Sequence, residues 1–93
     1  QTLIGFVKLK RALLNHQKGY VFLAHDGGLK GHKRIAQLAG KMPILCALTA
    51  TEIGIAFGRN RVVYAFISPS GLGDGLFRDM SRLAGLRETT LAA

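Results

Sequence analysis

The sequence PILCALTATEIGIAFG, at residues 43–58, decides the fold of this chain. Residues 44–48 are consecutive apolar residues, a pattern typical of a short strand that is covered on both faces. Thr49 and Glu52 have the spacing of a capping box, which predicts that a helix begins directly after this strand. Gly58 lies where that helix is expected to end. The stretch therefore predicts a strand, a tight loop and a short helix.

Two further apolar runs, at residues 20–24 and 62–67, predict strands on either side of this unit. Apolar residues at helical spacing predict helices at residues 5–15 and 29–39, and a last helix after Ser70, a suitable N-cap. Helices and buried strands thus alternate along the chain. Strands of continuous apolar character need a layer of helices on each face, so we predict an α/β fold, a three-layer α/β/α sandwich.

The first two predicted helices are amphipathic, with one apolar side and one polar, mainly basic side. The apolar sides comprise Phe6, Leu9, Leu13 and Leu14 in the first helix and Ile35, Leu38 and Ala39 in the second. The opposite sides comprise Lys8, Arg11 and Asn15 in the first helix and Lys30, Lys33 and Arg34 in the second.

A glycine-rich segment, GLGDG at residues 71–75, follows the last predicted strand. Its spacing is GxGxG rather than the GxGxxG of a dinucleotide-binding fingerprint, and it follows the last strand rather than the first. Glycine also weakens the first turns of a helix. We therefore predict a flexible loop at this point and no nucleotide site, with a frayed tail at residues 86–93.

Length and composition favour a single folded domain over residues 1–93, since 48% of the residues are hydrophobic and 19% are charged. The single cysteine, Cys46, has neither a disulfide partner nor further thiols for zinc, which favours a reducing compartment and the cytoplasm. No apolar run approaches a membrane span, and none resembles a signal peptide. Because the chain begins with Gln1, we expect it to be the C-terminal part of a longer protein.

The charge is strongly positive and unevenly distributed. The chain carries a net charge of +8, and residues 1–41 contain eight Lys or Arg residues but one acidic residue, Asp26. Such a one-sided field predicts a polyanionic partner, with nucleic acid favoured over a membrane surface. The alternative is a basic face that only keeps the protein in solution.

The residue types predict no enzyme, no metal and no cofactor. His16, His25 and His32 lack the paired spacing of metal ligands, so solvated or hydrogen-bonded histidines are expected. Cys46 lies in the middle of a predicted buried strand, where an inert thiol is expected. The acidic residues are too few and too scattered for catalysis by paired carboxylates.

The turn Asp26-Gly27-Gly28 lies between a predicted buried strand and a basic helix. Ligands bind α/β sheets at such strand ends, and helix N-terminal amides attract phosphate. The Asp26 carboxylate would itself repel an anion, so we favour a helix cap over a direct ligand contact for this residue.

Several motifs, in order and spacing, resemble the kink-turn-binding family of ribosomal proteins, which includes large-subunit proteins seven-A and thirty and their bacterial YlxQ-like relatives. The motifs are Gly5, Ala24-His25-Asp26, the helix from Leu29, the strand PILCAL at residues 43–48, and IGIAFG at residues 53–58. The resemblance implies RNA binding and a small mixed four-stranded sheet like that of ribosomal protein thirty.

The segments at residues 52–65 and 82–87 are also similar to the C-terminal domain of bacterial YlxR-like proteins, in which a basic nucleic-acid-binding module precedes a domain of this kind. This resemblance implies an RNA-binding factor associated with transcription termination or translation. The partners would be RNA together with the ribosome or the transcription machinery.

The chain departs from the kink-turn binders at the first helix. Their Asn-Glu pair and following Lys correspond here to Val7, Lys8 and Arg11, so contact with the RNA backbone is expected without reading of base edges. The loop Leu48-Thr49-Ala50 matches the family's apolar loop that packs on the RNA bulge. The residues expected to bind RNA are Gly5, Lys8, Arg11, Asp26, Gly27, Lys30, Lys33, Leu48, Thr49 and Ala50.

The sequence thus favours a small RNA-binding module that contacts the RNA backbone through a basic face. An alternative is a non-catalytic protein-interaction domain that tethers a companion nucleic-acid-binding domain. A third hypothesis is that the chain is an accessory domain of an RNA-modifying enzyme whose catalytic residues lie elsewhere. The sequence leaves the RNA target and the oligomeric state open.

Overall fold

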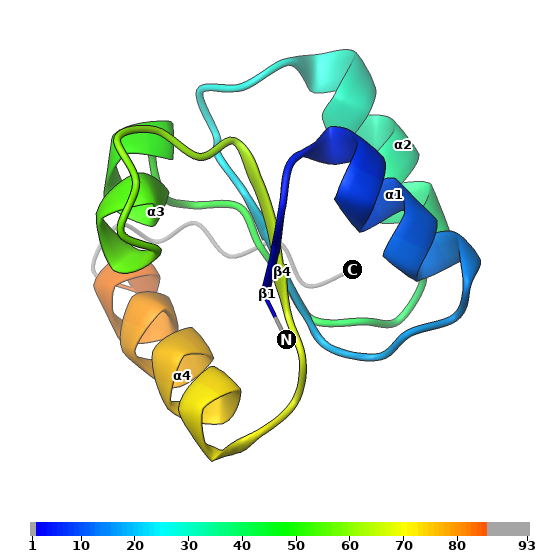
Figure 1. Cartoon of the computed structure of the whole chain (residues 1–93). Coiled ribbons are helices and arrows are strands. Elements are labelled where there is room, and N and C mark those ends of the chain that lie inside the picture. Colours follow the sequence, from blue (N-terminus) through cyan, green and yellow to red (C-terminus); the bar gives the residue numbers. More distant parts are fainter. Residues whose placement is uncertain (1, 86–93) are drawn as a thin grey trace.

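A computed structural model describes residues 2–85 of the chain (Figure 1). The strands are β1 (Thr2–Ile4), β2 (Tyr20–Leu23), β3 (Ile44–Leu45) and β4 (Tyr64–Ile67). The helices are α1 (Phe6–Leu14), α2 (Leu29–Ala39), α3 (Ala50–Ala56) and α4 (Gly71–Gly85). The alternation of helices and strands predicted from the sequence is confirmed from α1 onward.

The strands form one mixed sheet in the order β1-β4-β2-β3. Strand β4 is antiparallel to both of its neighbours, whereas β2 and β3 are parallel, with Phe22 beside Leu45. The four-stranded mixed sheet agrees with the resemblance, but β1 was not predicted from periodicity because three residues are too few to show a pattern. The ladder of β3 is also shorter than the predicted strand at residues 43–48.

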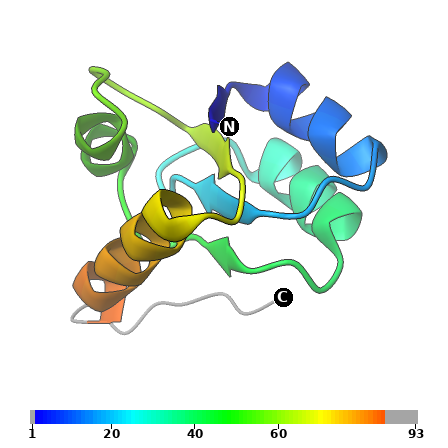
Figure 2. The ribbon, with the colours of Figure 1, turned by 60° about the horizontal axis from the view of Figure 1, so that its bottom comes forward.

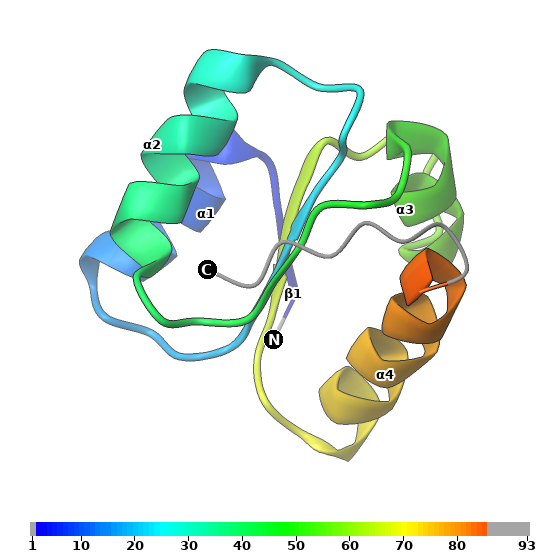
Figure 3. The same ribbon diagram turned by 180° about the vertical axis from the view of Figure 1, so that it is seen from behind.

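Helices α1 and α2 cover one face of the sheet, and α3 and α4 cover the other (Figures 1 to 3). Alternate strand residues therefore enter two separate cores. Val21 and Phe66 pack with Leu9 and Ile35 beneath α1 and α2. The other core, beneath α3 and α4, includes Phe22, Leu45, Leu48, Ile53, Ala65 and Met80. The predicted three-layer α/β/α sandwich is confirmed.

Some apolar residues at helical spacing do not face a core. Leu14 is 51% exposed, because the buried side of α1 is formed by Leu9, Ala12 and Leu13. Leu72 is 81% exposed although it has helical spacing with the buried Met80. These exposed side chains lie at helix ends, where the neighbouring layer no longer covers them.

The prediction of a flexible loop at residues 71–75 is wrong, because α4 already begins at Gly71. The hydroxyl of Ser70 accepts a hydrogen bond of 3.0 Å from the Gly73 amide and so caps the helix as expected. A Cβ atom at Gly73 would lie 2.3 Å from the Ser68 carbonyl oxygen. Glycine is therefore needed here for close packing of the helix start. The predicted frayed tail at residues 86–93 lies outside the described residues.

Candidate nucleic-acid interface

Strands β1 and β2 are antiparallel to β4, and β3 is parallel to β2, so β1, β2 and β3 run in the same direction. These three strands therefore end at the same edge of the sheet, which is the upper edge in Figure 1. The segments that follow them contain Gly5, the turn at Asp26, and the loop at Thr49. The first residues of β4 and the connection before it join these segments. The Gly5 amide donates to the Tyr64 carbonyl (3.0 Å), and the Val62 amide donates to the Ala50 carbonyl (3.0 Å).

Asp26 connects two of these segments. Its Oδ1 atom accepts a hydrogen bond of 2.9 Å from the amide of Ala50, the first residue of α3. The predicted capping role is therefore present, but at α3 rather than at α2, whose N-cap is Gly28 without a side-chain bond. Thr49 and Glu52 complete the N-terminus of α3 with the capping box that the sequence predicted. The carboxylate thus holds the β2–α2 turn against the start of α3.

Replacement of Asp26 with Ala is expected to lower the free energy of unfolding by about 1 to 3 kcal/mol, because the Ala50 amide loses its charged acceptor. Asp26→Asn keeps an acceptor oxygen and should cost less. Urea unfolding monitored by circular dichroism measures both values. Asp79→Ala, which removes an exposed acid from α4, controls for the change in net charge. If Asp26→Ala and Asp79→Ala cost the same, the Ala50 bond does not stabilise the turn.

Tyr64, the first residue of β4, packs against side chains near the same edge. Its ring makes edge-on contacts with Phe6 (5.2 Å between centroids) and His32 (5.3 Å). His32 Nε2 donates to the Ala24 carbonyl, since a carbonyl can only accept, and Nδ1 lies 3.3 Å from the Tyr64 hydroxyl. Burial raises the pKa of Tyr64, so its phenol remains protonated and can donate to Nδ1.

This network leaves little room at Gly27, where a Cβ atom would lie 2.6 Å from Val63 Cγ1 and 2.9 Å from His32 Cε1. Glycine at this position therefore allows the turn to lie close to β4. Sequence reasoning singled out Gly27 but did not identify Tyr64 or the partner of His32, because their contacts join residues far apart in the chain.

The loop Leu48-Thr49-Ala50 offers less surface than the resemblance implies. Leu48 and Ala50 are almost completely buried, and Thr49 is only partly exposed. Leu48 packs in the core beneath α3 and α4. Within this loop, Thr49 is thus the residue that remains accessible to a partner.

The predicted basic residues lie along the helices rather than at this edge. Lys8 and Arg11 are exposed on α1, about 4.5 and 9 Å from Gly5 along the helix axis at ~1.5 Å per residue. They line a hollow of about 290 Å³ beside β1, and Lys30 and Lys33 are exposed on α2. The hollow is lined by Leu3, Lys8, Arg11, Ala12, Asn15 and Gln17. The candidate residues therefore divide into an edge group and a helical group.

The fold separates the charges by layer. Helices α1 and α2 carry six Lys or Arg residues and no Asp or Glu, whereas α3 and α4 carry two Arg residues and three acids. The layer of α1 and α2 therefore has a charge of +6 and the opposite layer a charge of −1. The basic residues of α1 and α2 are Lys8, Lys10, Arg11, Lys30, Lys33 and Arg34.

Within residues 2–85, no three His, Cys, Asp or Glu side chains are arranged so that they could hold a metal ion. Cys46 is a buried free thiol, and burial raises its pKa, which lowers the fraction of reactive thiolate. None of the described helices is long and apolar enough to cross a membrane.

Neither the models of known protein families nor the curated proteins contain a match to this sequence. Among solved structures, a protein with unknown function from Bacillus halodurans is similar, with a TM-score of 0.75 and 23% sequence identity. The match covers 87% of this chain and 84% of that chain. The similarity supports the arrangement described above: the chain is a small α/β sandwich with a mixed four-stranded sheet.

Proposed function

We propose that the protein is an RNA-binding module whose α1 and α2 layer contacts the RNA backbone. The observation that carries this proposal is the separation of charge between the layers, +6 on α1 and α2 against −1 on α3 and α4. A basic patch on one face is the electrostatic footprint of a nucleic-acid-binding domain. Solubility alone does not require cations to cluster on one face of the protein.

The arrangement of α1 and α2 suits a phosphate backbone. The two helices pack beside each other and cover the same face of the sheet (Figures 1 and 3). Lys8 and Arg11 project from one helix and Lys30 and Lys33 from the other, and all four are exposed. Phosphates of one RNA strand, or of the two strands of a hairpin, can contact both rows of cations. Such contacts position a protein on RNA without reading the sequence.

The start of α1 favours binding without base recognition. Val7 is 64% exposed and offers no hydrogen-bonding group in its side chain, whereas Lys8 offers only donors. Reading of base edges by side chains of this helix turn is therefore poor. In our proposal the protein acts in the cytoplasm with the ribosome or the transcription machinery. The unpaired Cys46 fits a reducing compartment.

Replacement of both Lys8 and Arg11 with Ala tests this proposal. At low salt the pair should weaken RNA binding about 2- to 30-fold, if each exposed contact contributes ~0.2 to 1 kcal/mol. The loss should be equal for a kink-turn RNA and for an unrelated hairpin of the same length, because phosphate contacts do not read sequence. Competition binding of the two RNAs at one fixed salt concentration measures both effects.

The matched control removes Arg78 and Arg82 from α4, which takes the same charge from the opposite layer. This control should change affinity less than about twofold. Equal losses for the two double variants would show that total charge, and not the α1 and α2 layer, governs binding. A preference of the unmodified protein for the kink-turn above about 3 kcal/mol would show that side chains read base edges.

A second candidate is a tethering domain that binds another protein through the layer of α3 and α4. Ile55 is 74% exposed on α3, and Leu72 is also exposed at the start of α4. Exposed apolar side chains of this kind occur at protein interfaces. Absence of RNA binding at low salt would favour this candidate over the first.

A further inference from the structure

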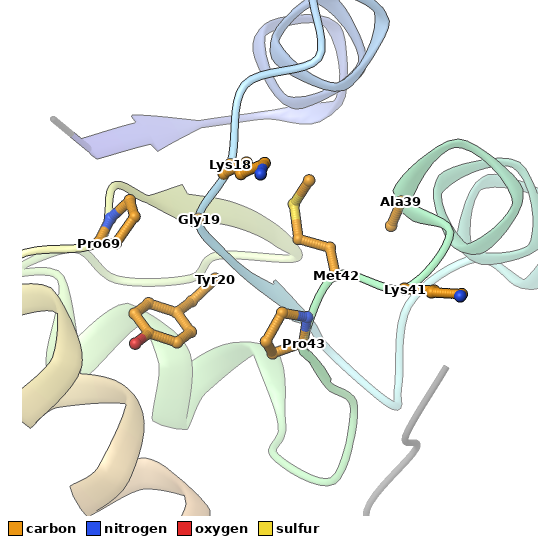
Figure 4. A pocket seen from close by; sticks show the side chains of 8 residues that line it. All are labelled: Lys18, Gly19, Tyr20, Ala39, Lys41, Met42, Pro43 and Pro69. Atoms are coloured by element: carbon orange, nitrogen blue, oxygen red, sulfur yellow. The ribbon is translucent and has the colours of Figure 1, made fainter.

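A pocket lies at the lower edge of the sheet, opposite the edge described above (Figure 4). Its residues come from the start of β2, from the connection between α2 and β3, and from the segment after β4. The pocket has a volume of about 460 Å³, which is in the range of ligand-binding pockets. It is lined by Lys18, Gly19, Tyr20, Ala39, Lys41, Met42, Pro43 and Pro69.

The wall of the pocket is mainly apolar and is held in place. The ring of Tyr20 stacks on Phe77, with 4.5 Å between centroids and an interplanar angle of 19°. Its hydroxyl donates a hydrogen bond to the Asp74 carboxylate, which raises the pKa of Tyr20 and keeps the phenol protonated. Met42 and Pro43 add a thioether and the apolar pyrrolidine ring of proline. These side chains suit a flat aromatic group.

The charge of the pocket is positive. Lys18 and Lys41 are exposed among its lining residues, and none of the eight lining residues is acidic (Figure 4). A ligand that matches the pocket therefore combines an aromatic body with anionic groups. A nucleotide has both properties, since its base can stack and its phosphates can contact lysine.

We propose that this pocket binds the base of an unpaired nucleotide in the bound RNA, with Lys18 and Lys41 contacting the flanking phosphates. The inference rests on the proposed function and extends it from the helical layer to a single-stranded segment. The 11 residues of α2 span ~16 Å from the upper edge to the region of the pocket. This distance equals about five steps of ~3.4 Å along a nucleic-acid strand. A single-stranded extension of six nucleotides is then long enough to reach it.

The experiment compares a blunt hairpin with the same hairpin carrying a six-adenosine extension. The extension should raise the affinity of the unmodified protein at least about fivefold, the lower end of what one base stack contributes. Lys18→Gln with Lys41→Gln should lower this ratio at least about twofold, because two exposed phosphate contacts of ~0.2 kcal/mol or more are lost while the stacked base remains. Lys33→Gln with Arg34→Gln, a matched pair on α2, should weaken both RNAs and leave the ratio unchanged.

Two further probes separate the base from the phosphates. An extension without bases should lose most of the gain in affinity, because only the phosphate contacts of Lys18 and Lys41 remain. Adenosine monophosphate alone should shift the NMR signal of the Met42 methyl group, and an unchanged signal at saturating nucleotide would count against the pocket. Retention of the full gain by the extension without bases would overturn the stacking role.

The proposal also fails if the extension adds no affinity while the blunt hairpin still binds, a result that leaves the α1 and α2 layer intact as the RNA site. If the six-nucleotide strand binds alone and the blunt hairpin does not, the pocket is supported and the proposed function of the layer fails. Lys18 and Lys41 follow the C-terminal ends of α1 and α2, where lysine stabilises a helix. If the Lys18→Gln, Lys41→Gln variant is less stable but keeps the affinity ratio, these lysines stabilise the helix ends and do not contact phosphates. That result would overturn the proposal.

Discussion

Replacement of Leu45 with Ala is expected to lower the free energy of unfolding by about 2 to 5 kcal/mol. Leu45 is 2% exposed and packs in the same core as Phe22 and Ile53. It pairs with Phe22 in the parallel ladder that joins β3 to the sheet. Truncation therefore removes buried contacts and leaves a cavity that the surrounding backbone cannot readily close. Small domains have a total stability of roughly 5 to 15 kcal/mol, so the loss is a large fraction of it.

Urea unfolding measures this loss through the change in midpoint at constant slope. Leu72→Ala is the matched control, because it makes the same chemical change at a side chain that is largely exposed. The control should shift the free energy by no more than about 0.5 kcal/mol. A loss below about 1 kcal/mol for Leu45→Ala would show that β3 contributes little to the fold.

The apolar runs predicted the layers because a strand covered on both faces has no polar side. Residues 20–24 and 44–48 show this pattern, and each of these residues but Tyr20 is buried in the structure. The start of α4, which contains Gly71 and Gly73, was wrongly predicted to be a flexible loop, because glycine has a low helix propensity. The tertiary contact of Gly73 with the Ser68 carbonyl, which makes glycine useful there, is not a local property of the sequence.

The candidate site was predictable in part. Asp26 and Thr49 follow strands that run in the same direction, and such strands end at one edge of a sheet. The order of the elements therefore predicts that the two segments meet. It does not predict the hydrogen bond between the Ala50 amide and Asp26, which are 24 residues apart in the sequence. The match of Leu48-Thr49-Ala50 to the family's loop also did not reveal that Leu48 and Ala50 are buried.

The separation of charge has a simple origin in the chain. The basic half of the sequence, residues 1–41, builds both α1 and α2, and these two helices cover the same face of the sheet. A sequence bias in one half thereby becomes a basic layer in space. The pocket at the lower edge of the sheet could not be predicted, because its lining residues come from three segments that are far apart in the sequence.

An increase in salt from 50 to 200 mM is expected to weaken RNA binding about 16- to 250-fold. The estimate assumes that three or four cations of the α1 and α2 layer neutralise phosphates. Each contact contributes ~0.7 to 0.9 to the slope of log affinity against log salt, so the slope should lie near −2 to −4. Fluorescence anisotropy with a labelled hairpin at five or more salt concentrations measures it.

The slope identifies the responsible side chains more directly than affinity does, because each lost phosphate contact lowers its magnitude by a fixed amount. Lys8→Ala with Arg11→Ala should reduce the magnitude by about 1.4 to 1.8. Arg78→Ala with Arg82→Ala removes the same charge from α4 and should leave the slope unchanged. Tight binding with a shallow slope would contradict the electrostatic account, since the basic layer could then not supply the affinity. A slope that changes equally in both double variants would mean that the RNA contacts both layers.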